Sequence, residues 1–371
     1  MSRILSAALA ATTLAAPVWA HHGFGGFDPA KEIEIEGTMT GIHFVNPHAY
    51  FYFDAVGSDG EITAMRCEMR AGGVLRRSGW TPEMFVTGAH VIVFGRPHRY
   101  DPASCYAETL TIGDAPTVQR YEQFDTASSA DRADRPLRLP SGEPNISGDW
   151  AQEQYLLAGS PNGRGGLVPK SMVAAVEAGE LAVSDVPNAG WGARPVTFTE
   201  AGDAASATVR GSTADNPRMR CEITSILFDW VFDGPINRIT QGEDEVTLEY
   251  GRGITRTVHM NMASHAADIA PSRAGHSIGH WEDDTLVVDT VGFEPGILAY
   301  PIVHSDRLHV VERFTLDPQT LALKRDYVAE DPVYYTDQYV GSDTVMPGDV
   351  PFAVDPCEEL ANVNYSQESD K

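Results

Sequence analysis

Histidines near the start of the chain offer the clearest metal-ligand chemistry in the sequence. His21 and His22 follow an apolar run, residues 4–16, and the small residues Val18 and Ala20, a pattern typical of a signal-peptidase site. Cleavage after Ala20 makes His21 the new N-terminus, so that its free α-amine and its ring Nδ1 can chelate one ion. Nitrogen ligands in a roughly planar arrangement favour Cu(II) among the common divalent metals. The sequence therefore predicts a copper site at the mature N-terminus, and a solvated end that merely carries two histidines is the alternative.

His48 is the predicted third nitrogen ligand. Alternate side chains of a strand point to opposite faces, so His48 shares one face with Tyr50 and Tyr52. The residues between them are apolar and are predicted to face a core. His21, His22 and His48 would then hold one metal ion, with the two tyrosines nearby. A turn histidine hydrogen-bonded beside Pro47 is the alternative interpretation.

Glu312, Arg256 and His304 form a second candidate site, a catalytic one. Glu312 and Arg256 each share the parity of the apolar residues in their own predicted strands, which points both side chains into a barrel. A carboxylate among apolar side chains must be paired, or its pKa rises. One interpretation is a buried ion pair. The other is a cavity in which Glu312 acts as general acid or base, with His304 at the barrel mouth.

A third group of titratable residues lies along the chain between Arg256 and His304. It comprises His259, His265, His276, His280, Glu282, Asp283 and Asp284. Glycines in this stretch argue against a helix that would align the histidines. The group would bind a divalent metal only if the fold brings it together, and a polar turn before a strand at 285–291 is the alternative.

Strand patterns dominate the elements that must position these residues. Short β-branched and aromatic runs punctuated by glycine predict about five strands between residues 31 and 117, with a helical turn near 76–85. After residue 219, strand patterns recur about every ten residues, at 223–232, 245–250, 255–260, 285–291, 308–316 and 321–327. A helix is predicted at 168–181. The fold class is therefore mainly all-β, with a small OB-like barrel followed by a larger lipocalin-like antiparallel barrel.

The chain is too long for one small core, so two domains are expected. The predicted organisation is a signal peptide at 1–20, an OB-like domain at 21–118, a polar linker at 119–144 and a lipocalin-like domain at 145–371. No second apolar run is long enough to span a membrane after cleavage.

Charge and cysteine content restrict the partners and the compartment. The formal net charge is −25, which disfavours nucleic acid and anionic membranes and leaves cations and neutral molecules as candidates. Four cysteines without a Cys-x-x-Cys spacing indicate disulfides in an exported chain, with Cys67–Cys105 and Cys221–Cys357 as the predicted pairs. The expected location is the periplasm or the medium.

Short stretches of the sequence resemble two exported families without an established activity. The first resemblance, to an uncharacterised domain family whose mature chains begin with two histidines, rests on His21–Phe24, Gly37–Thr40, Asn46–Ala49 and Leu75–Trp80. The second, to a large exported bacterial family, rests on Gly275–Thr290, His304–Asp306, Glu312–Phe314 and Asp331–Pro332. The resemblance implies location and architecture only. Asp283 stands where the second family usually has glycine.

Three functions remain open at this point. The first is an exported copper-binding protein or enzyme whose large barrel holds a small apolar organic ligand. The second is a metal-free lyase, isomerase or hydratase that uses Glu312, Arg256 and His304. The third is a non-catalytic ligand-binding protein. Common hydrolase, zinc-protease and nucleotide-binding motifs are absent from the sequence.

Overall fold

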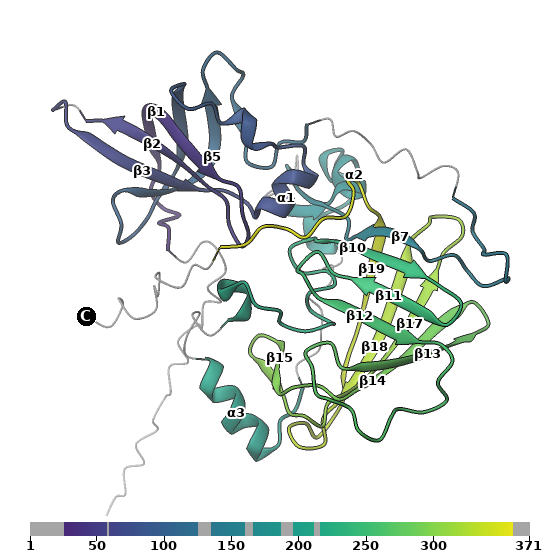
Figure 1. Ribbon diagram of the computed structural model, residues 1–371. Coiled ribbons are helices and arrows are strands. Elements are labelled where there is room, and N and C mark those ends of the chain that lie inside the picture. Colours follow the sequence, from purple (N-terminus) through teal and green to yellow (C-terminus); the bar gives the residue numbers. More distant parts are fainter. Residues whose placement is uncertain are drawn as a thin grey trace, which may run out of the picture.

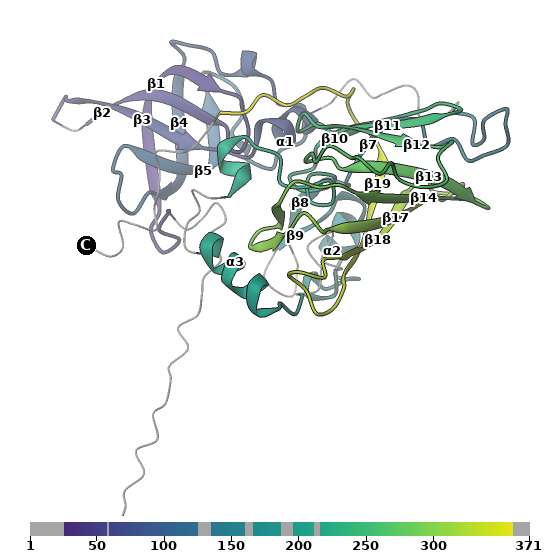
Figure 2. The ribbon, with the colours of Figure 1, turned by 60° about the horizontal axis from the view of Figure 1, so that its bottom comes forward.

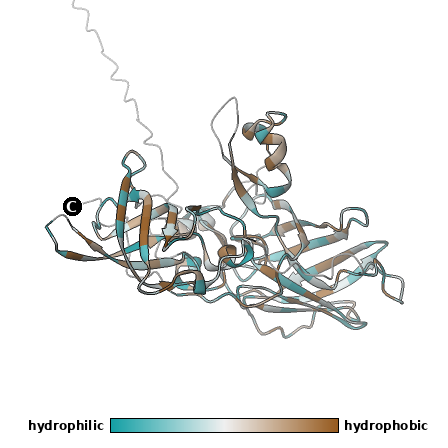
Figure 3. Cartoon of the chain, turned by 90° about the horizontal axis from the view of Figure 1, so that it is seen from above, coloured by the Kyte–Doolittle hydropathy of each residue, from teal (hydrophilic) through white to brown (hydrophobic). Residues whose placement is uncertain are grey.

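The protein consists of two β-barrels that follow one another along the chain and lie next to each other (Figure 1). The computed structural model describes residues 26–57, 59–124, 135–159, 166–186, 196–210 and 216–358. The prediction of a mainly β fold with a small and a larger barrel is confirmed. Along the strands, hydrophilic and hydrophobic residues alternate, as the two faces of a barrel wall require (Figure 3).

The small barrel has the strand order of an OB fold. Its sheet runs β3-β2-β1-β4-β5-β6, and a parallel pairing of β3 with β5 closes the first five strands into a barrel. The bounds are β1 Ile33–His43, β2 Tyr50–Val56, β3 Ile62–Glu68, β4 His90–Pro97, β5 Ser104–Ile112 and β6 Val118–Gln119. The helix α1 (Gly72–Arg77) and the 3-10 turn η1 (Pro82–Met84) connect β3 to β4.

The core of the small barrel follows the predicted alternation in β2. Ala49, Phe51 and Phe53 are completely buried, while Tyr50 and Tyr52 lie on the other face. The predicted disulfide Cys67–Cys105 joins β3 to β5 inside this core. It therefore links the two strands whose parallel pairing closes the barrel.

The large barrel is closed by nine strands in the order β10-β11-β12-β13-β14-β17-β18-β19-β7. All neighbours are antiparallel except β12 and β13, which are parallel. The bounds are β7 Gly148–Ala151, β10 Ile236–Gln241, β11 Glu245–Glu249, β12 Thr255–His259, β13 His276–Glu282, β14 Thr285–Val291, β17 His309–Leu316, β18 Leu323–Glu330 and β19 Tyr339–Pro347. The first strand pairs with the last one, so the ring includes both ends of this part of the chain.

The predicted strand at 223–232 is wrong. This segment is a series of turns whose side chains Ile226, Leu227 and Trp230 belong to the core of the large barrel. The buried carboxylate of Asp229 accepts hydrogen bonds from the backbone N–H groups just before it, which stabilises the turns. A short apolar run does not by itself distinguish a strand from a buried turn.

The remaining elements lie outside the large barrel wall (Figure 2). The predicted helix at 168–181 is shorter, because only η3 (Lys170–Met172) and α2 (Val173–Glu177) are helical. The helix α3 (Glu200–Arg210) was not predicted. The hairpins are β8 (Tyr155–Ala158) with β9 (Gly166–Pro169), and β15 (Gly296–Ala299) with β16 (Ile302–His304), and two 3-10 turns are η4 (Val183–Asp185) and η6 (Pro217–Arg220).

Residues 348–358, here called the C-terminal strap, join the two barrels. The strap leaves β19 and passes over to the small barrel, as the yellow segment in Figure 1 shows. Arg77 of α1 binds Asp349 of the strap at 2.9 Å, and Arg76 binds Asp355 at 3.0 Å. The predicted disulfide Cys221–Cys357 fixes the end of the strap beside the small-barrel residue Asn46.

The two disulfides are compatible with an extracellular location. Among the described residues, no helix has the length and apolar character needed to cross a membrane.

Candidate functional site

His48 lies immediately before β2, on the side of the small barrel that faces the large one. Hydrogen bonds of the next residue, Ala49, to the backbone of Arg70 and Met69 hold this part of the chain in place. His48 Nδ1 lies 3.1 Å from Glu68 Oε1, and neither atom has another partner among the described residues. The carboxylate therefore sets the orientation of the ring and leaves Nε2 for another ligand.

The pKa of His48 is lowered. Burial is the main cause, and it outweighs the opposite effect of the Glu68 carboxylate, while Arg218 and Arg120 lower the pKa further. His48 is accordingly neutral at physiological pH, which is the form that coordinates metals. About an eighth of its side-chain surface stays exposed, 13% against 8% for Glu68.

Two arginines, Arg120 and Arg218, lie close enough to His48 to lower its pKa. Arg120 stacks on the ring of Tyr106 at 3.6 Å, and its Nε and Nη1 are buried without a hydrogen-bond partner among the described residues. Burial lowers the pKa of Arg120 and of Arg70 to about 10 each. Arg218 instead pairs with Asp233 at 2.5 Å. No periodic pattern in the sequence indicates this cluster, because its members come from both domains.

The described chain begins beside His98 and Tyr106. Gly26 lies against the ring of His98, where a Cβ would approach Nε2 to 2.6 Å, so no larger residue fits there. The ring of Phe27 is 5.5 Å from that of Tyr106. Tyr106 stands opposite Glu68 in the β3–β5 pairing. The predicted ligands His21 and His22 lie outside the described residues.

Glu312 and Arg256 meet inside the large barrel. Arg256 Nη1 lies 2.5 Å from Glu312 Oε2, and Arg325 Nη1 lies 3.1 Å from Glu312 Oε1. Arg325 also binds Asp343 at 2.5 Å, and all four side chains are almost completely buried. Both oxygens of Glu312 are thus engaged by guanidinium groups, in an arrangement with two positive and two negative charges. Arg325 shares the parity of Leu323, so the same argument that found Arg256 would have found it.

His304 does not join this network. It lies in β16, where it is 5% exposed and its Nδ1 is 3.0 Å from the carbonyl oxygen of Ser305. Its ring packs edge-on against Phe293. Among the described residues it has no contact with Glu312 or Arg256, so the structure does not assemble the predicted catalytic trio.

The predicted histidine group is divided between two places. His265 Nδ1 lies 2.9 Å from His276 Nδ1, and its Nε2 lies 2.9 Å from Asp289 Oδ1. His259 stacks near His276, with 5.3 Å between the ring centroids. His309, which the sequence did not indicate, binds the same Asp289 carboxylate at 3.0 Å.

The other members of that group lie apart on the β13–β14 hairpin. His280 contacts Glu282 at 3.1 Å, and Asp284 pairs with Arg138 at 2.6 Å. Asp283 occupies the hairpin turn with φ 51°, a left-handed conformation that glycine or aspartate tolerates better than most residues. This part of the group is a polar turn before the strand at 285–291, which was the alternative to a metal site in the sequence analysis.

Comparison with known proteins gives a match to one family model. Residues 8–105 match the model of the family of unknown function DUF6152. The match includes His21, His48 and most of the small barrel, and it agrees with the predicted resemblance to a family without an established activity. Comparisons with curated proteins and with solved structures give no significant match.

Within the described ranges, no group of three or more His, Cys, Asp or Glu side chains is placed to hold a metal ion. His48 and Glu68 therefore form, at most, part of a metal site.

Proposed function

We propose that this chain is an exported metal-binding protein in which the mature N-terminal His21, together with His48, holds one copper ion, and in which His22 is a further candidate ligand. The observation that carries the proposal is the contact of Glu68 with Nδ1 of a neutral, mostly buried His48. A carboxylate on one ring nitrogen is the usual partner of a histidine whose other nitrogen binds a metal.

The length of the chain supports the proposal. After cleavage at Ala20, five residues, 21–25, would precede the first described residue, and five residues span about 17 Å when extended. Phe27 lies near Tyr106, whose strand neighbour Glu68 contacts His48. The proposal is that the N-terminal amine and imidazole of this short segment reach His48.

The charges around His48 partly oppose a cation. Arg120 and Arg218 lower the pKa of His48, whereas Glu68 and Asp233 raise it. Two carboxylates thus face two guanidinium groups, and Arg218 is already neutralised by its pairing with Asp233. The overall charge of −25 adds a long-range attraction for cations.

The alternative catalytic site is less well supported. Glu312 is 0% exposed, and arginines bind both of its oxygens. It therefore has no oxygen available to accept a proton from a substrate. We interpret Glu312 and Arg256 as a structural ion network of the large barrel.

The test begins with intact-mass analysis of periplasmic protein, which establishes whether the chain starts at His21. Copper titration of that protein, followed by EPR, is expected to show one Cu(II) with several nitrogen ligands. His48→Gln should weaken the affinity by about 100-fold or more, because loss of a ligand costs more than the 10–100-fold typical of an outer-shell partner, and should remove one nitrogen from the spectrum. His43→Gln, on the exposed end of β1, is the matched control and should change neither.

A second pair of variants separates the N-terminal chelate from His48. One extra alanine before His21 moves the free amine away from the imidazole and should abolish the tight site. If this extension and His48→Gln both retain the affinity and the spectrum of the unmodified protein, the proposal is wrong.

A further inference from the structure

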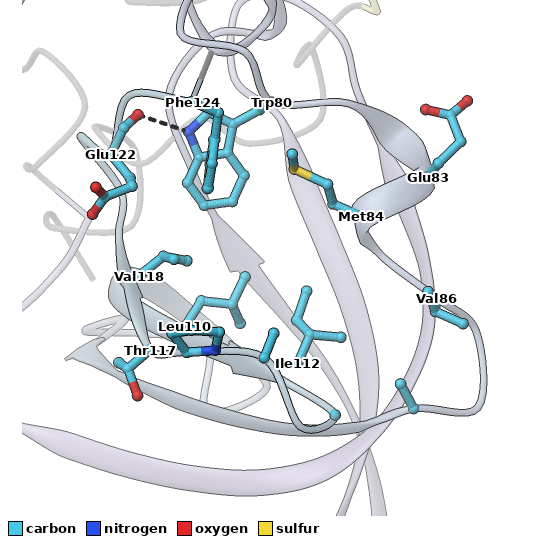
Figure 4. A pocket seen from close by; sticks show the side chains of 14 residues that line it. Trp80, Glu83, Met84, Val86, Leu110, Ile112, Thr117, Val118, Glu122 and Phe124 are labelled. Atoms are coloured by element: carbon cyan, nitrogen blue, oxygen red, sulfur yellow. Dashed lines mark hydrogen bonds between the residues drawn. The ribbon is translucent and has the colours of Figure 1, made fainter.

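An apolar pocket opens in the wall of the small barrel, away from the His48 site. It lies between η1, the end of β5, the turn that leads to β6 and the segment at 122–124, and its volume is about 700 Å³ (Figure 4). This is within the size range of pockets for small organic molecules, about 300–1,000 Å³.

The lining side chains are mainly apolar. They include Met84, Leu110, Ile112 and Val118, which project into the space in Figure 4. Trp80 is 2% exposed and its Nε1 donates to the carbonyl oxygen of Glu122 at 3.2 Å. The only indole donor of the lining is therefore already satisfied, so an occupant gains little from hydrogen bonding here and much from apolar contact.

The charged groups of the pocket have one sign. Glu83 and Glu122 stand on opposite sides of the pocket in Figure 4 with their carboxylates turned outward to its edge, and none of the fourteen lining residues is basic. Hydrogen bonds from its own backbone N–H and from Thr81 lower the pKa of Glu83, so its carboxylate is ionised. The aromatic pair Trp80 and Phe124, with centroids 5.1 Å apart, adds ring surface that attracts cations.

The segment of the protein that follows Phe124 cannot fill this apolar pocket itself. Residues 125–134 follow directly from Phe124 and contain no apolar side chain larger than alanine. A fatty acid would bring its carboxylate to a rim that already carries two.

From the apolar lining, the acidic rim and the aromatic pair, we propose that this pocket binds a hydrophobic organic cation of the alkylammonium or arylammonium class. The apolar part fills the space over Leu110 and Ile112, and the ammonium group stays at the opening, in the negative field of Glu83 and Glu122 and near the rings of Trp80 and Phe124. The proposal goes beyond metal binding at His48 and does not depend on it.

Calorimetric titration of the purified full chain with three twelve-carbon probes below their micellar concentrations tests this. The probes are dodecyltrimethylammonium, dodecanoate and the neutral dodecyl maltoside. We expect saturable binding at one site, with the cation favoured over the anion by about tenfold or more, equivalent to about 1.4 kcal/mol. Equal binding of all three, or tighter binding of dodecanoate, would overturn the proposed ligand class.

Two sets of variants locate the binding. Ile112→Trp or Val118→Trp should fill the pocket and abolish binding, whereas Val340→Trp, at an exposed position of β19, should not. Glu83→Gln with Glu122→Gln should remove most of the preference for the cation. Glu34→Gln with Glu36→Gln changes the net charge equally on β1, outside the pocket lining, and should leave the preference intact.

Folding and self-association are checked on the same samples. Thermal melting shows whether each tryptophan variant folds, and the second variant replaces the first where it does not. Sedimentation that shows a dimer abolished by Ile112→Trp would assign the pocket to a second copy of the chain and overturn the proposal. Cation binding that survives both pocket-filling variants would overturn it as well.

Discussion

Among single residues, Glu312 is a fully buried carboxylate at the centre of the ion network of the large barrel. It lies between Arg256 and Arg325, and the remaining donors of these arginines go to Ser277, Thr290, Asp343 and the backbone of 226–227. If the negative charge of Glu312 is removed, one buried guanidinium charge has no compensating carboxylate. The free energy of unfolding then falls by much more than the intact ion pair contributes to it.

Glu312→Gln should therefore destabilise the protein by about 3–5 kcal/mol. Urea unfolding measures the change, and Asp326→Asn is the control, because its pairing with Lys324 is exposed and contributes about 1 kcal/mol or less. A Glu312→Gln protein as stable as the control would show that Glu312 is held there for a reason other than structure.

Burial of Asp229 makes the stability of the folded protein depend on pH. Desolvation raises its pKa from 3.8 to about 6. Between these values the folded protein retains a proton that the unfolded chain has released, so the stability contribution is fully present below pH 3.8 and is lost as the pH rises through 6. The loss amounts to about 3 kcal/mol at 1.36 kcal/mol for each pKa unit.

Asp229→Asn removes this titration and keeps an oxygen for the N–H groups of Thr224 and Ser225. Relative to the unmodified protein, the variant should gain stability as the pH is raised from 4 to 7, as measured by urea unfolding at each pH. Asp185→Asn, an exposed aspartate, should give a flat difference. A flat difference for Asp229→Asn would mean that its pKa is not raised.

At the scale of elements, the contact of α1 with the C-terminal strap connects the barrels. Arg77 is 5% exposed, and it donates to Asp349, to the carbonyl oxygen of Gly234 at 2.8 Å and to that of Gln152 at 2.8 Å. One guanidinium on the small barrel thus binds three segments that belong to the large one.

Arg77→Met should remove these hydrogen bonds, leave Asp349 unpaired and destabilise the protein by about 3–5 kcal/mol. Because the barrels then lose a main connection, calorimetry should resolve two unfolding transitions instead of one. Arg66→Met, at an exposed pairing with Asp101, should keep a single transition. One unchanged transition in Arg77→Met would contradict this account.

The elements also show which parts of the fold were predictable. Strand patterns predicted β14 and β17 nearly to the residue, and alternation placed Glu312 and Arg256 inside, because period-two patterns report directly on which face is buried. The turns at 223–232 and the strand β19 were missed. The first has the apolar content of a strand, and the second mixes glycine, serine and aspartate because Asp343 is needed for Arg325.

The candidate site was less predictable than the fold. His48 was found because it sits in a strand pattern, but Glu68, Arg120 and Arg218 approach it from other segments and from the other domain. Sequence spacing carries no information on such contacts. The same limit explains why the sequence did not indicate that His304 packs against Phe293 or that His309 binds Asp289.

At the scale of the whole molecule, the charge of −25 should oppose compactness through mutual repulsion. Raising the ionic strength from about 0.01 M to about 0.15 M shortens the screening length from about 30 Å to about 8 Å. The melting temperature should therefore rise by several degrees over this range. Glu34→Lys with Glu36→Lys should reduce the slope, and a melting temperature that falls with salt would show that ion pairs dominate over repulsion.

The pairing of β7 with both β10 and β19 has a consequence for biosynthesis. A chain emerges from the ribosome with its N-terminal part first, so β7 is made long before the strand that completes the ring. Until β19 follows, the unfinished ring has two open strand edges that can pair with other nascent chains. A message truncated before codon 339 should therefore yield an aggregating product rather than a smaller stable protein, and complete translation is a precondition for a soluble one.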